Sequence, residues 1–245
     1  MGRRVPTAHK YYSMFKFLCE NGPASLSEIT DHLISEYGMR YSTARPAVTR
    51  LYRMLSEYGL VSDVGTDKRG SRVIDLTPKA LSILIMMIAS YGASYLSFHP
   101  KIIRPAVKRL CPRLLEKFDD FAKVVEEADK YGEKEKGDPY RRFVSEFFGY
   151  AAPLEEEFSG KKEYTCEDVN QAIDAGVEAI ISTLDDLEKD FEKAMASILM
   201  LDLKKEFKEV LLQKISNLLR EKKREVRKLR RKIRVLEKLI EDFKV

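Results

Sequence analysis

The chain has 245 residues, of which 44% are hydrophobic and 34% are charged, and its formal net charge is +5. This length can hold one or two domains with a real core, and the composition is typical of a soluble, largely helical protein. Cys19, Cys111 and Cys166 lie far apart without a C-x-x-C pair, which predicts reduced cytosolic thiols rather than a disulfide framework or zinc site. The N-terminal residues lack the apolar stretch of a signal peptide.

The charges are segregated along the chain. Lys and Arg exceed Asp and Glu by 4 in residues 1–80, by 4 in residues 81–112 and by 8 in residues 201–245, whereas the acids exceed the bases by 11 in residues 113–200. Segregation of this size indicates an anionic partner and pairing between segments of the chain itself.

Three helices are predicted in the first sixty residues. Apolar residues recur at helical spacing over residues 9–20, until the Asn-Gly-Pro sequence at 21–23 ends the first helix. Ser25 and Glu28 form the capping-box pattern that opens a second helix, which ends at Gly38. A third helix is expected to be capped by Ser42, so that Pro46 falls in its first turn, where a missing backbone N–H is tolerated.

The third helix has two faces, and a basic hairpin is expected to follow it. One face is apolar, with Val48, Leu51, Tyr52, Leu55 and Tyr58, and the other holds Arg45, Thr49, Arg50 and Arg53. Beyond Val61 the sequence predicts a strand, a tight turn between two glycines and a return strand, with Lys68 and Arg69 at the tip. Thr77 and Pro78 have the N-cap and first-residue pattern of a fourth helix.

The capped helix at 25–37, the run YRMLSEYGLV at 52–61, the basic turn and the run DLTPKAL at 75–81 together resemble the winged-helix domain of the PadR and MarR regulator families. The resemblance covers roughly the first third of the chain. It implies that the third helix enters the major groove of DNA, and that the wing contacts a flanking minor groove or phosphates.

Seven side chains of this region are predicted to contact double-stranded DNA. The candidates for base edges are Arg45, Thr49 and Arg50, since arginine suits the bidentate contact with guanine. The candidates for phosphates or the minor groove are Arg53, Lys68, Arg69 and Arg72. A solvated basic face is the alternative, but six cations that converge from separate segments favour DNA. No nucleophile–base, metal or phosphate-loop pattern is present, so no catalytic site, metal site or cofactor is expected.

The middle of the chain is expected to be helical. Residues 80–100 carry no formal charge, but their second half is too polar for a membrane span, which predicts a helix buried at a dimer interface and no membrane association. The basic stretch 101–113, broken by two prolines, is expected to form short helical turns, either as a connector or in contact with flanking DNA. A later aromatic cluster favours core packing over a small-molecule effector pocket: Phe143, Phe147 and Phe148.

The last eighty residues predict one long helix. Thr165 and Asp168 form another capping box, and apolar residues then recur at alternating 4–3 spacing from Ile173 to Phe243. Residues 167–192 have a net charge of −8 and residues 220–234 one of +8. This favours an antiparallel coiled coil between two chains, with a hairpin that folds back near 201–206 as the alternative. The basic run at 220–234 also resembles a nucleic-acid-binding helix, although its charges are expected to surround the helix.

The predicted fold is mainly α with a small β-wing. It comprises a winged helix-turn-helix domain with an interface helix at 1–98, a helical middle region at 99–164 and a coiled-coil oligomerisation segment at 165–245. The expected function is a sequence-specific transcriptional regulator, cytoplasmic and nucleoid-associated, that binds double-stranded DNA as a homodimer or higher homo-oligomer. Two alternatives stay open: an architectural or DNA-segregation protein that bridges duplexes with low sequence specificity, and a winged helix that serves only as a protein-interaction scaffold.

Overall fold

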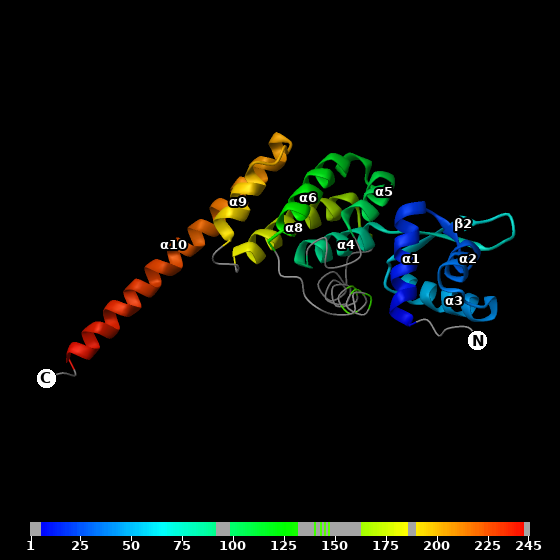
Figure 1. Cartoon of the computed structure of the whole chain (residues 1–245), viewed down its shortest axis with the longest axis horizontal. Helices are drawn as coiled ribbons and strands as arrows, with labels where there is room; N and C mark the ends of the chain where they lie inside the picture. The colour runs from blue at the N-terminus through cyan, green and yellow to red at the C-terminus, as the bar shows by residue number, and fades with distance from the viewer. Residues whose placement is uncertain are drawn as a thin grey trace. The chain divides into compact units, whose positions relative to one another are not determined.

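A computed structural model describes residues 6–91, 99–131, 163–185 and 190–242, together with residues 140, 143, 145 and 147. The fold is mainly α with a small three-stranded antiparallel sheet, as the sequence predicts (Figure 1). The chain divides into two compact units, unit 1 (Met1–Asp202) and unit 2 (Leu203–Val245). In chain order the elements are α1 (Thr7–Asn21), β1 (Ala24–Ser25), α2 (Leu26–Tyr37), α3 (Tyr41–Glu57), β2 (Val61–Thr66), β3 (Arg72–Leu76), α4 (Pro78–Tyr91), α5 (Pro100–Leu110), the 3₁₀ turn η1 (Pro112–Leu114), α6 (Leu115–Ala128), α8 (Cys166–Asp185), α9 (Phe191–Leu199) and α10 (Lys205–Asp242).

The capping signals of the first helices are confirmed. The backbone N–H of Glu28 donates to Ser25 Oγ over 3.2 Å, and the N–H of Ser25 donates to Glu28 Oε2 over 2.7 Å. This reciprocal pair satisfies two backbone donors that the start of α2 leaves unpaired. Gly38 then ends α2 in the left-handed conformation, with a φ of 63°.

The sheet has the order β1-β3-β2, so β3 is its central strand. The hairpin of β2 and β3 is the one that the sequence predicts, and its register shifts between Asp63 and Gly65, which leaves one extra residue on β2. The additional strand β1 pairs Ala24 with Ile74 and Ser25 with Val73. Two residues are too few to show a strand pattern in the sequence, and their pairing depends on where β3 lies.

A buried ion pair joins the central strand to two helices. Arg109 on α5 donates to both carboxylate oxygens of Asp75 on β3, over 2.8 and 3.0 Å, and also to the backbone carbonyl of Leu18 on α1, over 3.1 Å. The Asp75 side chain is only 6% exposed. A Cβ placed on Gly22 would lie 3.2 Å from the Arg109 guanidinium, so this glycine leaves room for the pair. Through these contacts Arg109 fixes α1, α5 and the sheet to one another.

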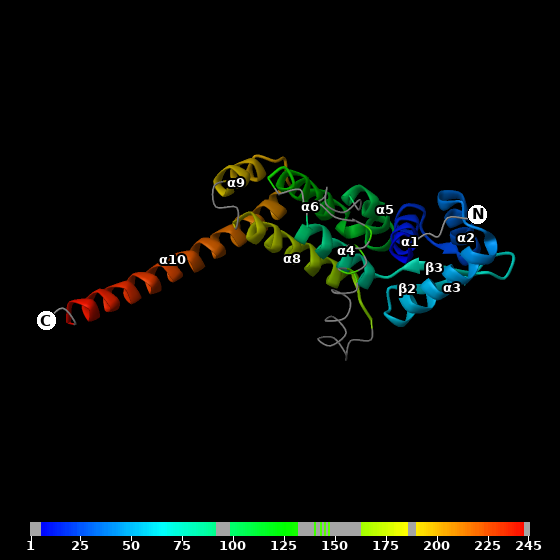
Figure 2. The same ribbon diagram turned by 60° about the horizontal axis from the view of Figure 1, so that its bottom comes forward.

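The apolar helix after the hairpin is buried within its own chain. Thr77 caps α4 and Pro78 is its first residue, as predicted. Helix α8 packs along α4 (Figure 2), and a Cβ on Gly176 of α8 would lie 3.1 Å from the Ala89 Cβ of α4. The burial of Leu81, Ile85 and Ile88 therefore comes from this packing. Packing within the chain therefore accounts for the apolar residues of α4, and a dimer interface at this helix stays a prediction.

The basic stretch at 101–113 is more regular than expected. Helix α5 runs from Pro100 through Pro105 to Leu110 without a break, and His99 caps it by accepting the Lys101 N–H. The prediction of short turns is wrong: Pro105, the sixth residue of α5, removes the backbone donor to the Lys101 carbonyl, but the helix continues past it to Leu110. Arg104 is paired with Asp119 on α6 over 2.7 Å.

The aromatic cluster belongs to the core. Phe143 and Phe147 are almost completely buried, and their rings lie against Phe15 of α1 with centroids 5.8 and 4.4 Å apart. Core packing, the favoured prediction, is therefore confirmed for these two residues, while Phe148 lies outside the described residues. None of the helices that the structure describes combines the length and hydropathy of a membrane span.

The C-terminal segment is not one helix, and unit 1 extends past the predicted boundary at residue 165. Helix α8 packs on α4 and α6, α9 packs on α6, and both belong to unit 1, which ends at Asp202. Their apolar repeat is therefore core packing, with Ile173, Val177 and Ile180 buried. The chain leaves helical conformation between α9 and α10, near the point that the hairpin alternative proposes. The antiparallel coil requires the acids of 167–192 and the bases of 220–234 on one coil, whereas the apolar face of α8 is covered by α4 and α6 of its own chain.

A disulfide joins Cys111, just after α5, to Cys166 at the start of α8, with their Cα atoms 5.5 Å apart. The prediction of reduced thiols is wrong for Cys111 and Cys166, because their distance in the sequence does not show that the fold brings them together. Cys19 is the free cysteine, and burial raises the pKa of its thiol well above the usual range. The disulfide closes a loop of 55 residues, whose closure entropy in the unfolded chain favours the folded state.

We expect the double substitution Cys111→Ser and Cys166→Ser to lower the free energy of unfolding by about 2–4 kcal/mol, because the unfolded chain regains the freedom of the closed loop. Urea denaturation with and without dithiothreitol measures this. Reductant should lower the stability of the wild-type protein to that of the variant and leave the variant unchanged. Alkylation of Cys111 and Cys166 before any reduction would contradict the disulfide.

Candidate nucleic-acid interface

Helix α3 begins two residues earlier than the sequence suggests. Its N-cap is Arg40, which makes no side-chain capping bond, and the backbone N–H groups of Thr43 and Ala44 both donate to the Arg40 carbonyl over 2.9 Å. The predicted cap, Ser42, therefore lies inside the helix, and Pro46 lies beyond its first turn. Backbone bonds to Arg40 replace the side-chain cap that the sequence pattern favours.

The two faces of α3 are arranged as predicted. The buried face holds Ala44, Val48, Leu51 and Leu55, which are at most 3% exposed. Arg50 and Arg53 are exposed, and Arg45 and Thr49 are partly buried. Because the buried residues fix the rotation of the helix, the cations of α3 lie on the side away from the core.

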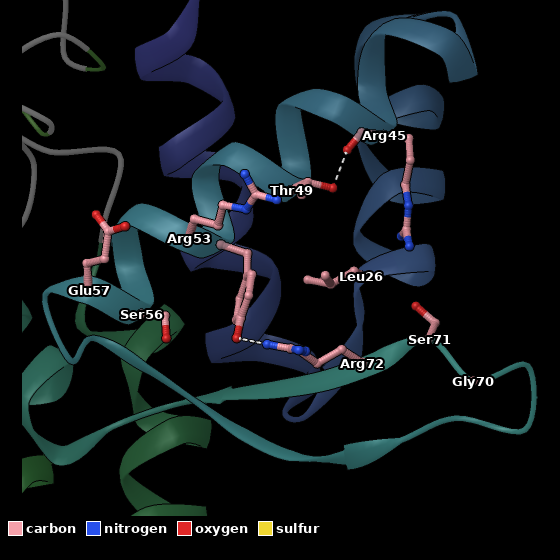
Figure 3. Close-up of a pocket in the computed structure, with 10 residues that line it drawn as sticks. Leu26, Arg45, Thr49, Arg53, Ser56, Glu57, Gly70, Ser71 and Arg72 are labelled. Carbon is pink, nitrogen blue, oxygen red and sulfur yellow. Dashed lines mark hydrogen bonds between the residues drawn. The ribbon is translucent and has the colours of Figure 1, made fainter.

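An open groove of about 550 Å³ separates α3 from the β2–β3 hairpin. Figure 3 shows Arg45 extending from α3 towards Ser71, with Thr49 and Arg53 farther along the helix. The groove brings four of the seven predicted contact residues together, and its lining consists of Leu26, Arg45, Thr49, Tyr52, Arg53, Ser56, Glu57, Gly70, Ser71 and Arg72.

Two groove residues of α3 have hydrogen-bonding capacity of different kinds. The Nη1 atom of Arg45 is inaccessible to solvent and has no hydrogen-bond partner, although a buried donor of this kind normally finds one. The hydroxyl of Thr49 donates to the Arg45 carbonyl over 3.0 Å, so its oxygen is left as an acceptor. The groove therefore has a buried, unsatisfied donor at Arg45 and a neutral acceptor at Thr49, one helical turn apart.

Arg72 is held by the protein itself. Its guanidinium donates to the Tyr52 hydroxyl, lies 3.1 Å from Asp63 Oδ2 and stacks over the Tyr52 ring with a separation of 5.1 Å. The Tyr52 hydroxyl in turn donates to the Asp63 carboxylate over 3.1 Å. The Tyr52 hydroxyl, followed by the Asp63 charge, raises the pKa of Arg72, which stays protonated. Arg72 thus connects α3 to the hairpin, a role that the sequence analysis does not assign to it.

The hairpin tip is fixed by one carboxylate. Asp67 Oδ1 accepts the backbone N–H groups of Arg69 and Ser71, each over 2.8 Å, and Gly70 takes a φ of 73°. The Ser71 N–H, followed by that of Arg69, lowers the pKa of Asp67, so the carboxylate stays ionised as an acceptor. This turn leaves Lys68 and Arg69 exposed at the tip.

The structure separates the seven predicted residues into three sets. Arg45, Thr49, Arg53 and Arg72 line the groove, and Lys68 and Arg69 lie at the hairpin tip beyond it. Arg50 lies roughly 140° around α3 from Arg45, so it faces outward beside the groove. No hydrogen bond or ion pair within the described chain occupies the side chains of Arg50, Arg53, Lys68 or Arg69.

Tyr52 is the groove residue that sequence reasoning assigns only to the core. Its ring is buried, as the helical spacing predicts, but its hydroxyl reaches Asp63 and Arg72 on the hairpin. The only sign of this contact in the sequence is the presence of tyrosine, rather than leucine or phenylalanine, at a core position, because a buried hydroxyl requires a hydrogen-bond partner. Among the described residues, no group of three His, Cys, Asp or Glu side chains could hold a metal ion.

We expect Tyr52→Phe to lower the free energy of unfolding by about 1–2 kcal/mol, because Asp63 and Arg72 lose the hydroxyl that they share. Urea denaturation followed by circular dichroism measures the effect. Tyr41→Phe on the same helix is the control, since that side chain is 60% exposed, and it should change the stability little. Equal stability of the two variants would show that the hydroxyl contributes nothing to the attachment of the hairpin.

Comparisons with protein-family models, with characterised proteins and with solved structures gave no match to this chain. The geometry and charge of α3 and the β2–β3 hairpin are therefore the basis of the functional proposal.

Proposed function

We propose that unit 1 binds double-stranded DNA through α3 and the β2–β3 hairpin, and that the protein is a sequence-specific transcriptional regulator. The observation that carries this proposal is the groove between the two elements. Arg45 and Arg53 line it from α3, Lys68 and Arg69 extend from the hairpin tip, and no ion pair within the described chain neutralises these four cations. A polyanion is the ligand that such an arrangement favours.

The order of the elements supports a winged helix-turn-helix. Helices α2 and α3 pack together, α3 leads directly into β2, and the hairpin returns to α4. In that fold the second helix of the pair enters the major groove and the hairpin acts as a wing beside it. Helix α3 spans 17 residues and exposes Arg50 and Arg53 to solvent. It is therefore the proposed recognition helix.

The proposed roles follow from the chemistry of each side chain. Arg45 and Arg50 are suited to guanine, which offers two acceptors at its major-groove edge. Thr49 has an acceptor to offer, which suits the exocyclic amino group of adenine or cytosine. The remaining cations are proposed to contact phosphates, which position the protein without reading sequence: Arg53, Lys68 and Arg69, with Arg72 supporting the hairpin from its pair with Asp63.

A second copy of the chain is the proposed partner of α10. This helix of 38 residues is about 57 Å long and exposes apolar residues seven apart, at Leu212, Leu219, Val226 and Ile233. If these residues occupy the same core position of successive heptads, Glu225 and Arg230 lie at the positions that flank the core. In a parallel pair Glu225 of one chain faces Arg230 of the other, and the opposite charges attract. The dimer proposed here is therefore parallel, and two recognition helices would meet a palindromic site. Binding of this kind would place the protein on the nucleoid.

Selection of binding sites from a pool of random duplexes, at two salt concentrations, tests the proposal. We expect an enriched sequence that persists at the higher salt concentration, because base contacts are less sensitive to salt than phosphate contacts. Binding without any enriched sequence would favour an architectural protein. Absence of binding even at low salt would contradict DNA binding and favour a protein-interaction scaffold.

In the same assay, Arg50→Ala with Arg53→Ala should weaken binding to the selected duplex on the order of tenfold or more. It should also reduce the slope of log K against log salt by about 2, since two cations no longer displace counterions. The matched control is Lys130→Ala with Lys193→Ala, which removes the same charge from the end of α6 and from α9. Equal effects of the two pairs would assign the binding to net charge rather than to α3.

A further inference from the structure

Helix α10 carries the densest positive charge of the described chain. Residues 220–234 hold ten basic and two acidic side chains within one uninterrupted helix. Every one of these side chains is exposed. The described acids of 167–192, which the antiparallel coil would set against this run, belong to α8, to α9 or to the N-cap of α9 in unit 1.

The helix sorts these charges onto one side. At 100° per residue, seven of the ten cations fall within an arc of about 120°. The sequence-based expectation that the charges surround the helix is therefore wrong for most of them. We call this set the basic stripe, and it consists of Arg220, Lys223, Arg224, Arg227, Arg230, Arg231 and Arg234.

The basic stripe is separate from the apolar stripe of the same helix. The exposed residues Leu219, Val226, Leu229 and Ile233 are centred about 115° around the helix from the basic stripe. The two acids, Glu221 and Glu225, lie on the side away from the basic stripe. A second copy bound to the apolar stripe would thus leave most of the basic stripe open to solvent.

The basic stripe is electrostatically unfavourable on its own. Like charges four residues apart destabilise a helix, and the stripe contains this spacing at Arg220 and Arg224, and again at Arg227 and Arg231. None of its seven side chains forms an ion pair or hydrogen bond within the described chain. A bound polyanion removes this repulsion, so the stripe has more to gain from such a ligand than an ordinary mixed surface has.

We propose that the basic stripe of α10 binds the phosphate backbone of double-stranded DNA, without sequence preference, as a second site independent of α3 and the hairpin. The stripe extends over about 21 Å, along which a duplex presents about 12 phosphates. Six of its seven residues are arginine, whose guanidinium suits phosphate through paired hydrogen bonds. The proposal stands whether or not unit 1 binds DNA.

The composition of α10 favours duplex DNA over two other polyanions, single-stranded nucleic acid and an anionic membrane surface. Proteins that bind single strands stack the bases on aromatic rings, and residues 208–242 contain no Phe, Tyr or Trp. A helix that lies on an anionic membrane buries its apolar face and has cations along the polar face above it. Here one flank of the apolar stripe mixes Glu221 and Glu225 with Lys228 and Lys232, so an anionic surface would attract that flank much less than the basic stripe.

The test uses the full chain in the Arg50→Ala, Arg53→Ala background, which removes the proposed α3 contacts. The stripe variant carries Arg220→Gln, Arg227→Gln and Arg234→Gln. The control variant carries Lys214→Gln, Lys228→Gln and Lys232→Gln, which remove the same charge from the other side of α10. Circular dichroism establishes that both variants retain the helix. The probe is a labelled DNA duplex of about 30 base pairs and random sequence, titrated between about 50 and 200 mM salt.

We expect the stripe variant to reduce the slope of log K against log salt by about 2–3 and to bind at least about tenfold more weakly at the lower salt concentration. The control should change affinity less than about threefold. Equal losses in both variants, or no loss in the stripe variant, would overturn the proposal. So would stripe-dependent binding to vesicles of anionic phospholipid that exceeds binding to the duplex. If Arg50→Ala and Arg53→Ala alone have no effect on DNA binding while the stripe variant does, the α3 proposal fails and this one stands.

Discussion

The ion pair of Arg109 with Asp75 holds the β2–β3 hairpin to the helices of unit 1. Asp75 lies on β3, the central strand, so whatever fixes this residue also fixes β1 and β2. Arg109 reaches it from α5 and simultaneously bonds the carbonyl of Leu18 at the end of α1. Loss of one partner from a buried pair leaves an uncompensated charge, which typically costs about 3–5 kcal/mol. The pair therefore fixes the hairpin to α1 and α5, which is one of the two attachments on which the shape of the groove depends.

A second network, of Tyr52, Asp63 and Arg72, joins α3 directly to the hairpin. Arg72 is paired within this network and is therefore less available to a phosphate. The same network fixes the hairpin that carries Lys68 and Arg69 at its tip. The other cations around the groove have no partner within the described chain. Rigid attachment of the two elements, combined with unpaired charge on both, is the arrangement that a pre-organised anion-binding surface needs, because little conformational freedom is lost on binding.

Local chemistry made part of this fold predictable. The Ser25 capping box, Gly38 after α2 and the pair Thr77-Pro78 act within one turn, so the sequence alone predicts the helix ends that they form. The start of α3 was misplaced because a backbone cap at Arg40 replaced a side-chain cap. Other features could not be predicted because they join segments far apart in the sequence. They are the pair of Arg109 with Asp75, the disulfide of Cys111 with Cys166 and the packing of α8 on α4. The 4–3 apolar repeat could not distinguish α8, whose apolar face is buried in unit 1, from α10, whose apolar residues are largely exposed, since both helices have one apolar face.

The central claim is that α3 and the hairpin form one DNA-binding surface. Hydrogen–deuterium exchange of the full chain, with and without a saturating selected duplex, tests it most directly because the measurement reports contact segment by segment. The account predicts slower exchange at the exposed start of α3 and at residues 67–72, with the amides of α6 and α9 unchanged. Protection confined to α10, or to none of these segments, while the duplex is bound would contradict it.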